Sequence, residues 1–350
     1  MDLPVRIGHD APGLSPDDPV ISVDGAWGAR GLNLSHWPGH TTPPELRHDL
    51  STGSALLFAE LPAERRQALA AGAVAIVNNH YDTDGTCSLF AVRHPELALP
   101  RKDRLLAAAS AGDLFAYPDD HALCVDAIVA GLADPERSLW RERIAGLDDR
   151  ARHEAVTLEL LDALPDILDG KIEPYTELWE PVLDAARCDV RDVENAARDE
   201  LVHLDLTVVT ASTNTRSSRG GTESFDPGRH ALFGTCTTDR VLVIGPGSVG
   251  TTYRLIVSTL SWFDLVTREG LERPDLARLA ERLNELEGAA GAAAWHAQSA
   301  SGASPELWFG TAENPSFSEH APCLLPSRLD PAVVRREVFD AARETLPLVE

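Results

Sequence analysis

Residues 73–91 read AVAIVNNHYDTDGTCSLFA, and this stretch decides the fold class that we predict for the chain. The run from Ala73 to Val77 is apolar throughout, which is typical of a strand buried on both faces. A polar segment follows, and after Gly85 the sequence becomes apolar again with a composition that suits a helix. A buried strand that leads into a helix is the repeating unit of α/β proteins with a mostly parallel sheet.

Three side chains after this predicted strand can face a common point. Alternate residues of an extended segment point to the same side, so His80, Asp82 and Asp84 project together. Ligands of open α/β sheets collect at the carboxyl ends of the strands. One imidazole and two carboxylates suit Mn²⁺, Mg²⁺, Fe²⁺ or Zn²⁺. The same residue types also form ordinary turns, in which case Asp84 or Thr86 would simply cap the following helix.

A second group of acidic residues lies where we predict a junction between two helices. Asp113 ends the first of these helices, and Asp119 or Asp120 begins the second, next to His121. A carboxylate at a helix start is also favourable without any metal, because it caps free N–H groups and meets the positive end of the helix dipole. We treat Asp113 and Asp120 as candidate metal ligands and His121 as a candidate catalytic residue.

The segment from Val77 to Ala91, VNNHYDTDGTCSLFA, resembles the first motif of the DHH superfamily of metal-dependent phosphoesterases. The resemblance implies that His80, Asp82 and Asp84 bind Mn²⁺ ions and take part in catalysis. It further implies an N-terminal α/β domain, a smaller C-terminal domain that binds substrate, and hydrolysis of a phosphoester or phosphoanhydride bond. The Asp-His-His motif of the superfamily is absent, and the nearest string is at residues 119–121. The glycine-rich C-terminal motif is not evident either.

Two segments of the C-terminal part are candidates for binding an anionic substrate. Arg216 and Arg219 lie among hydroxyl and glycine residues, and arginine can hold a phosphate or carboxylate through two parallel hydrogen bonds. A solvated surface loop is the alternative interpretation of this segment. The second candidate is the string from Gly245 to Gly250, which follows a predicted strand and includes Gly247 and Ser248.

The GxGxxG spacing of that string allows a tight turn that brings a helix N-terminus against a phosphate. We expect a helix over about residues 252–266, in which Arg254 lies one turn after Gly250 and can join the anion site. The second strand and its acidic residue, which complete a dinucleotide-binding unit, do not follow. A structural turn or a phosphate-sized site therefore fits the string better than a dinucleotide site.

The amino-acid composition limits the kinds of partner that we expect the protein to bind. The net charge is −24, from 55 acidic and 31 basic residues, and such a surface repels nucleic acid. Neither a basic leader followed by an apolar segment nor an apolar run of membrane-spanning length occurs, so we expect a cytoplasmic protein without a membrane partner. The five cysteines show no CxxC pair and imply no disulfide framework. The sequence has seven tryptophans, and a homodimer interface is one of the places where such large apolar side chains can be buried.

We predict an α/β fold with a mostly parallel sheet in an N-terminal lobe, a helical connecting block, and a smaller C-terminal α/β (α+β) lobe. The N-terminal domain, with the candidate metal site, spans residues 1–133, the connector spans 134–200, and the C-terminal substrate-binding domain spans 201–350. In the last domain the sequence predicts strands at 203–210, 231–235 and 241–244. It predicts helices at about 252–266 and 274–287, with weaker strand signals near Ala293 and Leu307.

The function that the sequence favours is a divalent-metal-dependent, phosphoesterase-like hydrolase. Its metal, Mn²⁺ by the resemblance, would activate a water molecule that attacks a small anionic and phosphorylated substrate. One alternative is a nucleotide-dependent enzyme that uses the turn from Gly245 to Gly250. Another is a non-catalytic protein that binds a metal or another ligand.

Overall fold

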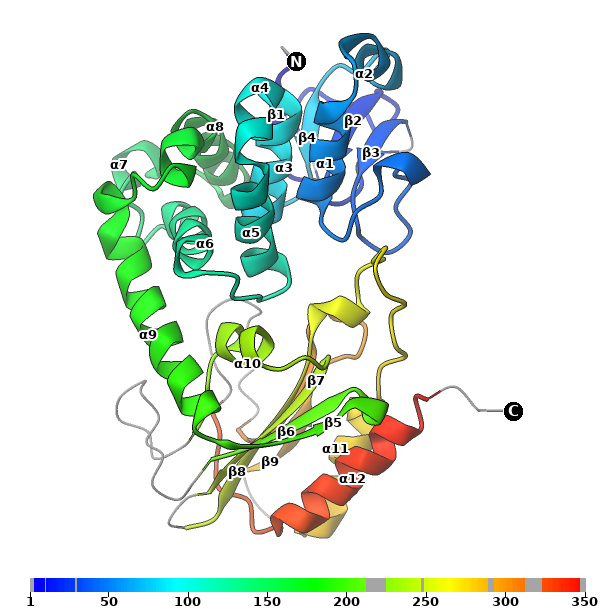
Figure 1. The fold of residues 1–350 in the computed structure, drawn as a ribbon, viewed down its shortest axis with the longest axis vertical. Helices are drawn as coiled ribbons and strands as arrows, with labels where there is room; N and C mark the ends of the chain where they lie inside the picture. The colour runs from blue at the N-terminus through cyan, green and yellow to red at the C-terminus, as the bar shows by residue number, and fades with distance from the viewer. Residues whose placement is uncertain are drawn as a thin grey trace. The chain divides into compact units, whose positions relative to one another are not determined.

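The computed structural model describes residues 3–9, 11–28, 30–211, 225–246, 249–288, 293–311 and 323–346. The chain divides into two compact units (Figure 1). Unit 1 contains Met1–Asp184 and Phe263–Glu269, and unit 2 contains Ala185–Trp262 and Gly270–Glu350. Each unit combines helices with one sheet, which confirms the predicted mixed α/β class. The residues that we expected as a connector, 134–200, divide between the units after Asp184.

Unit 1 is built on a four-stranded parallel sheet with the order β1-β4-β2-β3. The strands are β1 Val5–Ile7, β2 Val20–Val23, β3 Gly31–Leu34 and β4 Ile76–Asn78. The strand predicted at residues 73–77 thus begins at Ile76, and all of its residues are buried. Because β4 lies between β1 and β2, the carboxyl ends of β4, β2 and β3 are neighbours at one edge of the sheet.

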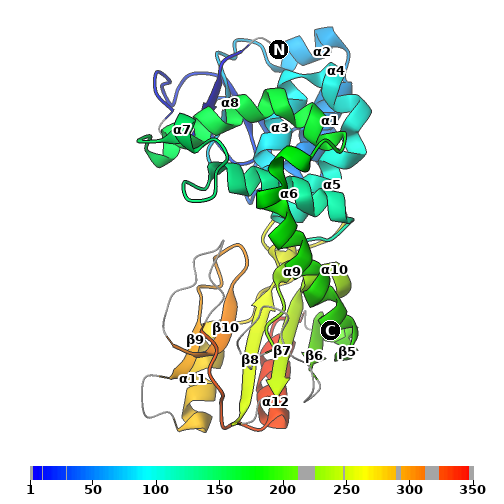
Figure 2. The same ribbon diagram turned by 90° about the vertical axis from the view of Figure 1, so that its left-hand side faces the viewer.

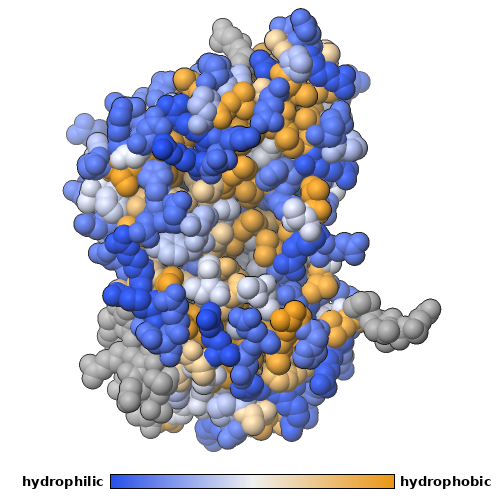
Figure 3. Space-filling view, viewed as in Figure 1, coloured by the Kyte–Doolittle hydropathy of each residue, from blue (hydrophilic) through white to orange (hydrophobic). Residues whose placement is uncertain are grey.

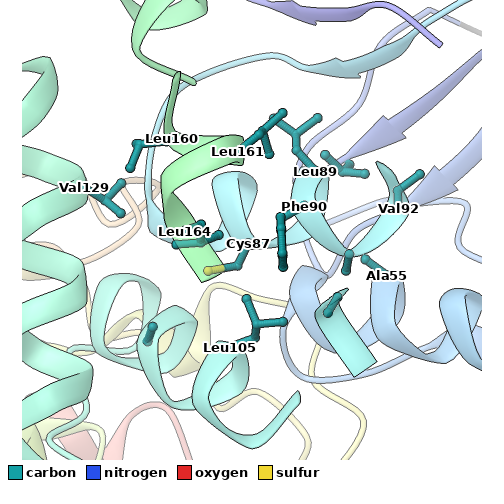
Figure 4. Close-up of a cluster of buried hydrophobic side chains, with 14 of the residues drawn as sticks. Ala55, Cys87, Leu89, Phe90, Val92, Leu105, Val129, Leu160, Leu161 and Leu164 are labelled. Atoms are coloured by element: carbon teal, nitrogen blue, oxygen red, sulfur yellow. The ribbon is translucent and has the colours of Figure 1, made fainter. Parts of the chain in front are cut away.

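Helices cover one face of this sheet. Helices α1 (Ser51–Glu60) and α3 (Thr83–Arg93) pack on each other and on the strands, and α5 (Lys102–Asp113), α6 (Asp120–Ala133) and α8 (Asp149–Leu168) pack around them. Figure 4 shows Cys87 and Phe90 of α3 close to Leu105 of α5 and Leu164 of α8. The remaining helical segments of this part are η1 Pro44–Leu46, α2 Ala63–Leu69, α4 Pro95–Ala98, η2 Leu99–Arg101, α7 Arg141–Ile144, η3 Glu173–Tyr175 and α9 Thr176–Glu194.

The apolar periodicity of the helical block matches this packing. Apolar residues that recur at intervals of three or four along α5 and α6, such as Leu105, Leu123 and Ile128, are fully buried. Leu158 of α8 is the exception, because 42% of it is exposed while Leu161 and Leu164 are buried. The opposite face of the sheet is covered by a smaller apolar cluster, made by Ala11, Val20, Trp27, Ala75 and Val77.

Unit 2 is built on a six-stranded mixed sheet with the order β5-β6-β7-β8-β10-β9 (Figure 2). Its strands are β5 Ala197–Leu201, β6 Leu206–Thr210, β7 Arg240–Pro246, β8 Thr251–Val257, β9 Ala294–Ala297 and β10 Glu306–Gly310. Alternate residues of β7 belong to different cores: Leu242 packs with α11 (Leu276–Glu287) and α12 (Pro331–Arg343), and Val243 packs with α10 (Arg229–Thr235). The sheet therefore has helices on both faces, as its near-continuous apolar strands require.

Two secondary-structure predictions for unit 2 are wrong. Residues 231–235, expected as a strand, belong to α10, whose Ala231 and Leu232 are its buried face. Residues 252–266, expected as a helix, instead form β8 and the short helix η5 (Thr259–Ser261). Every residue of β8 after Thr251 is buried, and a short apolar run that is buried on both faces has no periodicity to separate strand from helix.

Because residues 251–257 form a strand, the string from Gly245 to Gly250 lies between two strands and not between a strand and a helix. This string connects β7 and β8, which are antiparallel, and Gly245 pairs with Thr252 across the hairpin. Strand β8 follows the string at Thr251, so the described residues at this point contain no helix N-terminus that could bind a dinucleotide phosphate. The candidate ligands Gly247 and Ser248 lie outside the described residues.

The surface is that of a strongly charged protein. Hydrophilic side chains cover most of the face drawn in Figure 3, and the hydrophobic ones form small groups. Within the described ranges, none of the helices has both the length and the apolar character that crossing a membrane demands.

Candidate metal centre

The polar residues that follow three adjacent strands of unit 1 gather at the carboxyl edge of its sheet. Asp24 follows β2 directly, and His36 comes two residues after the end of β3. The segment after β4 adds His80, Asp82 and Asp84, and Asp113 is the last residue of α5. This is the edge where open α/β sheets bind their ligands.

The ligating atoms of these residues form two groups that share Asp24. The four-residue group consists of Asp24, His36, Asp84 and Asp113, and the three-residue group consists of Asp24, His80 and Asp82. Within each group all of the ligand atoms lie within 4.8 Å of one another. Ligands on opposite sides of a small divalent ion are about 4.2 Å apart, since each bond measures about 2.1 Å. A small contraction of each group would therefore bring its atoms to the spacing of ligands around one ion.

His36 is the imidazole of the four-residue group. Its Nε2 atom lies 3.0 Å from Asp113 Oδ2, 3.6 Å from Asp84 Oδ2 and 3.8 Å from Asp24 Oδ1. Its Nδ1 atom lies 2.6 Å from the carbonyl oxygen of Asp49, which can only accept a hydrogen bond. This carbonyl therefore places the proton of a neutral ring on Nδ1 and directs the Nε2 lone pair toward the carboxylates, as metal-binding histidines require.

His80 is the imidazole of the three-residue group and is held in a similar way. Its Nε2 atom lies 2.7 Å from Asp82 Oδ2 and 3.2 Å from Asp24 Oδ2, and its Nδ1 atom lies 2.6 Å from Asn79 Oδ1. The side chains of His80 and Asp82 are 29% and 32% exposed, whereas those of His36, Asp24 and Asp84 are fully buried. Solvent and small molecules can thus reach the three-residue group directly.

Asp24 belongs to both groups and turns one carboxylate oxygen toward each of them. Oδ1 accepts hydrogen bonds from Ser51 Oγ at 3.0 Å and from Trp37 Nε1 at 3.2 Å, and it faces His36. Oδ2 faces His80 and accepts no hydrogen bond of normal geometry among the described residues. The backbone φ of Asp24 is +47°, a left-handed conformation that aspartate tolerates better than most residues. Such strain is concentrated at functional sites.

Two of the predicted ligands also have structural tasks. Asp82 caps α3 by accepting a hydrogen bond from the N–H of Gly85 at 2.8 Å, so the cap of this helix is Asp82 and not Asp84 or Thr86. Asp84 accepts the backbone N–H groups of Ser51 and Thr52, both at 2.8 Å, at the start of α1. The capping interpretation of this segment is therefore correct in part, and it coexists with the two groups of ligand atoms.

The electrostatics of the centre favour a bound cation. Four carboxylates and two imidazoles make up the two groups, so negative charge is in excess. Burial, together with the charge of Asp82, raises the pKa of Asp24 to about 7, and it also raises the pKa of Asp113 well above its usual value. Burial alone would raise the pKa of Asp82 and lower that of His80, but their mutual attraction outweighs it. The pKa of Asp82 is therefore about 2, and that of His80 lies well above its usual value.

The other candidate residues are not brought into this centre. Asp120 and His121 belong to neither group, because they occupy the first turn of α6, where the Tyr117 hydroxyl donates to Asp120 and His121 Nε2 lies 3.0 Å from the carbonyl oxygen of Ile167. Arg254 lies on β8 in unit 2, where it is buried against Glu306 and Asp226. Arg216 and Arg219 lie outside the described residues.

Asp24 and His36 are candidate ligands that the sequence analysis did not assign. The signal that could have found them is the rule that located His80, since Asp24 comes directly after a short strand at residues 20–23 and His36 comes two residues after one at 31–34. The missing information was the strand order, because only the insertion of β4 beside β2 brings the three strand ends together.

Fold and site together describe a two-unit α/β protein with two groups of candidate metal ligands in unit 1. Residues 13–350 match the model of DUF6687, a family of unknown function, and the chain belongs to this family. The comparisons with curated proteins and with solved structures find no match.

Proposed function

We propose that this protein is a divalent-metal-dependent, phosphoesterase-like hydrolase that acts on a small, anionic, phosphorylated substrate. The observation that carries the proposal is the position of Asp24, which turns one carboxylate oxygen toward each of two groups of ligand atoms. Centres with two metal ions about 3.5–4 Å apart are characteristic of enzymes that transfer or hydrolyse phosphoryl groups.

The donor set fits Mn²⁺, the ion that the resemblance implies, and also fits Fe²⁺, Zn²⁺ or Mg²⁺, because it combines carboxylate oxygens with imidazole nitrogens and contains no thiolate. Divalent ions bound there would lower the pKa of water and would polarise a phosphoryl oxygen. The chain's own residues divide the remaining work. Asp24 would fix the spacing of the two ions, and His36 and Asp84 would hold one of them out of reach of solvent. His80 and Asp82 would present the other ion to the substrate.

The surroundings of the three-residue group support this division of roles. Trp37 is half-buried, its ring centroid lies 5.0 Å from that of His80, and its indole N–H donates to Asp24. An aromatic side chain beside an exposed metal ligand can limit the approach of water and contact the apolar part of a substrate. Arg216 and Arg219 stay our prediction for residues that bind the anionic group.

The arrangement also bears on the resemblance to the DHH phosphoesterases. The string at residues 119–121 was the nearest match to the Asp-His-His motif, but it does not reach the centre. His36 supplies a second imidazole from a position before the segment with His80 in the chain. We therefore propose a centre of similar chemistry with a different order of ligands along the sequence.

The decisive experiment compares Asp82→Asn with Asp119→Asn. Both residues cap a helix with a carboxylate oxygen at 2.8 Å, and asparagine also caps well, but only Asp82 belongs to a ligand group. We expect the wild type and Asp119→Asn to bind two Mn²⁺ ions per chain. Asp82→Asn should retain about one ion. Its rate of hydrolysis of a phosphodiester or pyrophosphate substrate should fall by at least about 100-fold, because one of the two metal ions is missing.

The measurements are isothermal titration with Mn²⁺ and a phosphate-release assay on the same preparations. Failure of the wild type to bind Mn²⁺, Fe²⁺ or Zn²⁺ would overturn the proposal. Stoichiometric binding without hydrolysis of any phosphomonoester, phosphodiester or pyrophosphate would favour the alternative, a non-catalytic metal-binding protein.

A further inference from the structure

A short segment from the C-terminal half of the sequence is part of unit 1 and lies against the four-residue group. Residues Phe263–Glu269, which we call the strap, belong to unit 1, while the chain on both sides of them belongs to unit 2. The Phe263 ring stacks on the His36 ring with a centroid distance of 3.8 Å and an interplanar angle of 20°. Phe263 is only 7% exposed, and it thus covers the face of a metal-ligand candidate.

The strap is fixed at both ends by hydrogen bonds to the loop around His36. At one end the N–H of Asp264 donates to the carbonyl oxygen of His36 at 2.8 Å, and Asp264 Oδ2 accepts the N–H of Gly39 at 3.2 Å. At the other end Asp49 Oδ1 accepts the N–H groups of Val266 at 2.6 Å and Thr267 at 3.0 Å. The Thr267 hydroxyl donates to Asp49 Oδ2 as well.

Asp49 therefore connects the strap with the imidazole. Its side chain holds the strap, and its carbonyl oxygen lies 2.6 Å from His36 Nδ1 and sets the tautomer of the ring. The loop that carries Asp49 also leads into α1, whose first N–H groups bond Asp84. One face of the His36 ring and its Nδ1 atom are thus both held by groups that depend on the docked strap.

We propose that the strap is a positioning element that sets the metal affinity of the four-residue group, with Phe263 and Asp49 as its positioning residues. This inference rests on the proposed metal centre. When the strap is docked, the His36 ring has one orientation, and metal binding requires no further ordering of it. When the strap is released, the His36 ring can rotate and water reaches its face. Part of the free energy of metal binding is then used to fix the orientation of the ring. The free energy by which the docked strap strengthens metal binding must then equal the free energy by which bound metal strengthens docking of the strap.

The three-residue group should not share this dependence. His80 takes its orientation from Asn79 on the segment after β4, and its ring neighbour is Trp37. The hydrogen bonds and the ring stacking that fix the strap are made to His36, Gly39 and Asp49. The proposal therefore distinguishes the two ions, which a general loosening of unit 1 would not do.

The test uses the full-length chain with Phe263→Leu, which keeps most of the apolar volume and removes the stacked ring, and with Phe263→Tyr, which retains the ring. The matched control is Phe90→Leu, the same change at a buried position of the core (Figure 4). Mn²⁺ dissociation constants are measured by titration in two backgrounds. In Asp82→Asn only the four-residue group can hold an ion, and in His36→Ala only the three-residue group can.

We expect Phe263→Leu to weaken Mn²⁺ binding about 10-fold in the Asp82→Asn background and to change it by less than about twofold in the His36→Ala background. Phe263→Tyr should restore binding to nearly the parental value, and Phe90→Leu should leave both constants nearly unchanged. Hydrogen exchange gives a second readout, because Mn²⁺ should slow exchange of the Val266 and Thr267 amides, and less so in Phe263→Leu.

The outcomes separate the two proposals. If the wild type binds two ions and Phe263→Leu has no effect in the Asp82→Asn background, the role of the strap is wrong while the metal centre stands. Equal weakening in both backgrounds also contradicts it, because the effect would then be a general loss of order. Absence of metal binding by the wild type overturns the proposed function itself.

Discussion

At the scale of single residues, the carboxylate of Asp24 is unfavourable for the stability of the metal-free protein but is shared by both groups of candidate metal ligands. Its side chain is fully buried among other carboxylates, and its raised pKa shows that the folded protein resists its negative charge. A raised carboxyl pKa means that stability is present when the group is protonated and is lost as the pH rises from the ordinary value of 3.8 through about 7. Above that range the metal-free protein has to bury the charge, and a bound cation would relieve it.

Asp24→Asn should therefore stabilise the metal-free protein and abolish metal binding at the same time. The asparagine oxygen can still accept the hydrogen bonds from Ser51 and Trp37. We expect the variant to melt about 2–4 °C higher than the wild type at pH 8, which is the effect of about 1 kcal/mol in a domain of this size. The difference should shrink as the pH falls from 7 toward 4, because the wild-type carboxyl then becomes protonated.

Thermal melting in the presence of a chelator, across this pH range, gives the measurement. Addition of Mn²⁺ should reverse the order of the two proteins at pH 8, since only the wild type has the shared carboxylate. A lower melting temperature for Asp24→Asn under every condition would mean that the carboxylate itself stabilises the fold, against our expectation.

At the scale of elements, the segment around β4 and α3 could be predicted from the sequence, because an apolar strand, a polar turn and an apolar helix follow each other without interruption. The group around Asp24 could not, since its members come from three strand ends and the end of α5, and strand order is not encoded locally. The same limit explains the errors at α10 and β8. Both are short and apolar, and only their packing on the sheet of unit 2 selects helix for one and strand for the other.

Strands β8 and β10 of unit 2 are joined by a buried network of charges. Arg254 of β8 makes two hydrogen bonds to Glu306 of β10, at 2.7 and 2.8 Å, and also pairs with Asp226. Arg229 at the start of α10 pairs with the same glutamate. These pairings keep the pKa of Glu306 below its usual value in spite of burial. Arg254, which we considered a substrate ligand, thus has its guanidinium occupied by protein carboxylates.

Glu306→Gln should strongly destabilise unit 2, because the guanidinium groups of Arg254 and Arg229 would lose a buried counter-charge. Removing one member of a buried ion pair typically costs about 3–5 kcal/mol. The matched control is Glu344→Gln, which removes a carboxylate from an exposed pair with Arg278 and should change little. Urea denaturation of both variants, followed by far-UV circular dichroism, measures the difference. Equal stability of the two variants would show that the network contributes nothing net.

At the scale of the whole molecule, every side chain of the candidate centre lies in unit 1. Bound metal should therefore stabilise unit 1 directly. In hydrogen-exchange mass spectrometry we expect Mn²⁺ to increase the protection of α3 and α5, which carry or adjoin ligands, and to leave β7 and β8 largely unchanged. Equal protection of both units would contradict this assignment.

The charge of −24 sets a second property of the whole chain. A surface with so much negative charge attracts divalent cations and repels anions at low ionic strength. An anionic substrate therefore needs positive charge close to where it binds, and ions bound at the exposed three-residue group would provide it. The overall charge and the chemistry of the centre thus favour the same order of events, in which metal binds before substrate.

The return of the chain to unit 1 at Phe263 also determines when that unit can be completed during synthesis. Chains are made from the N-terminus, so all six ligand candidates, the last of them Asp113, emerge well before the strap does. Until then the acidic residues of the centre lack the aromatic ring that covers His36. A nascent chain would thus hold an open cluster of carboxylates while more than a hundred further residues are added. Full metal affinity would come only after about half of unit 2 has been translated, so maturation of the centre would depend on residues far beyond its last ligand candidate.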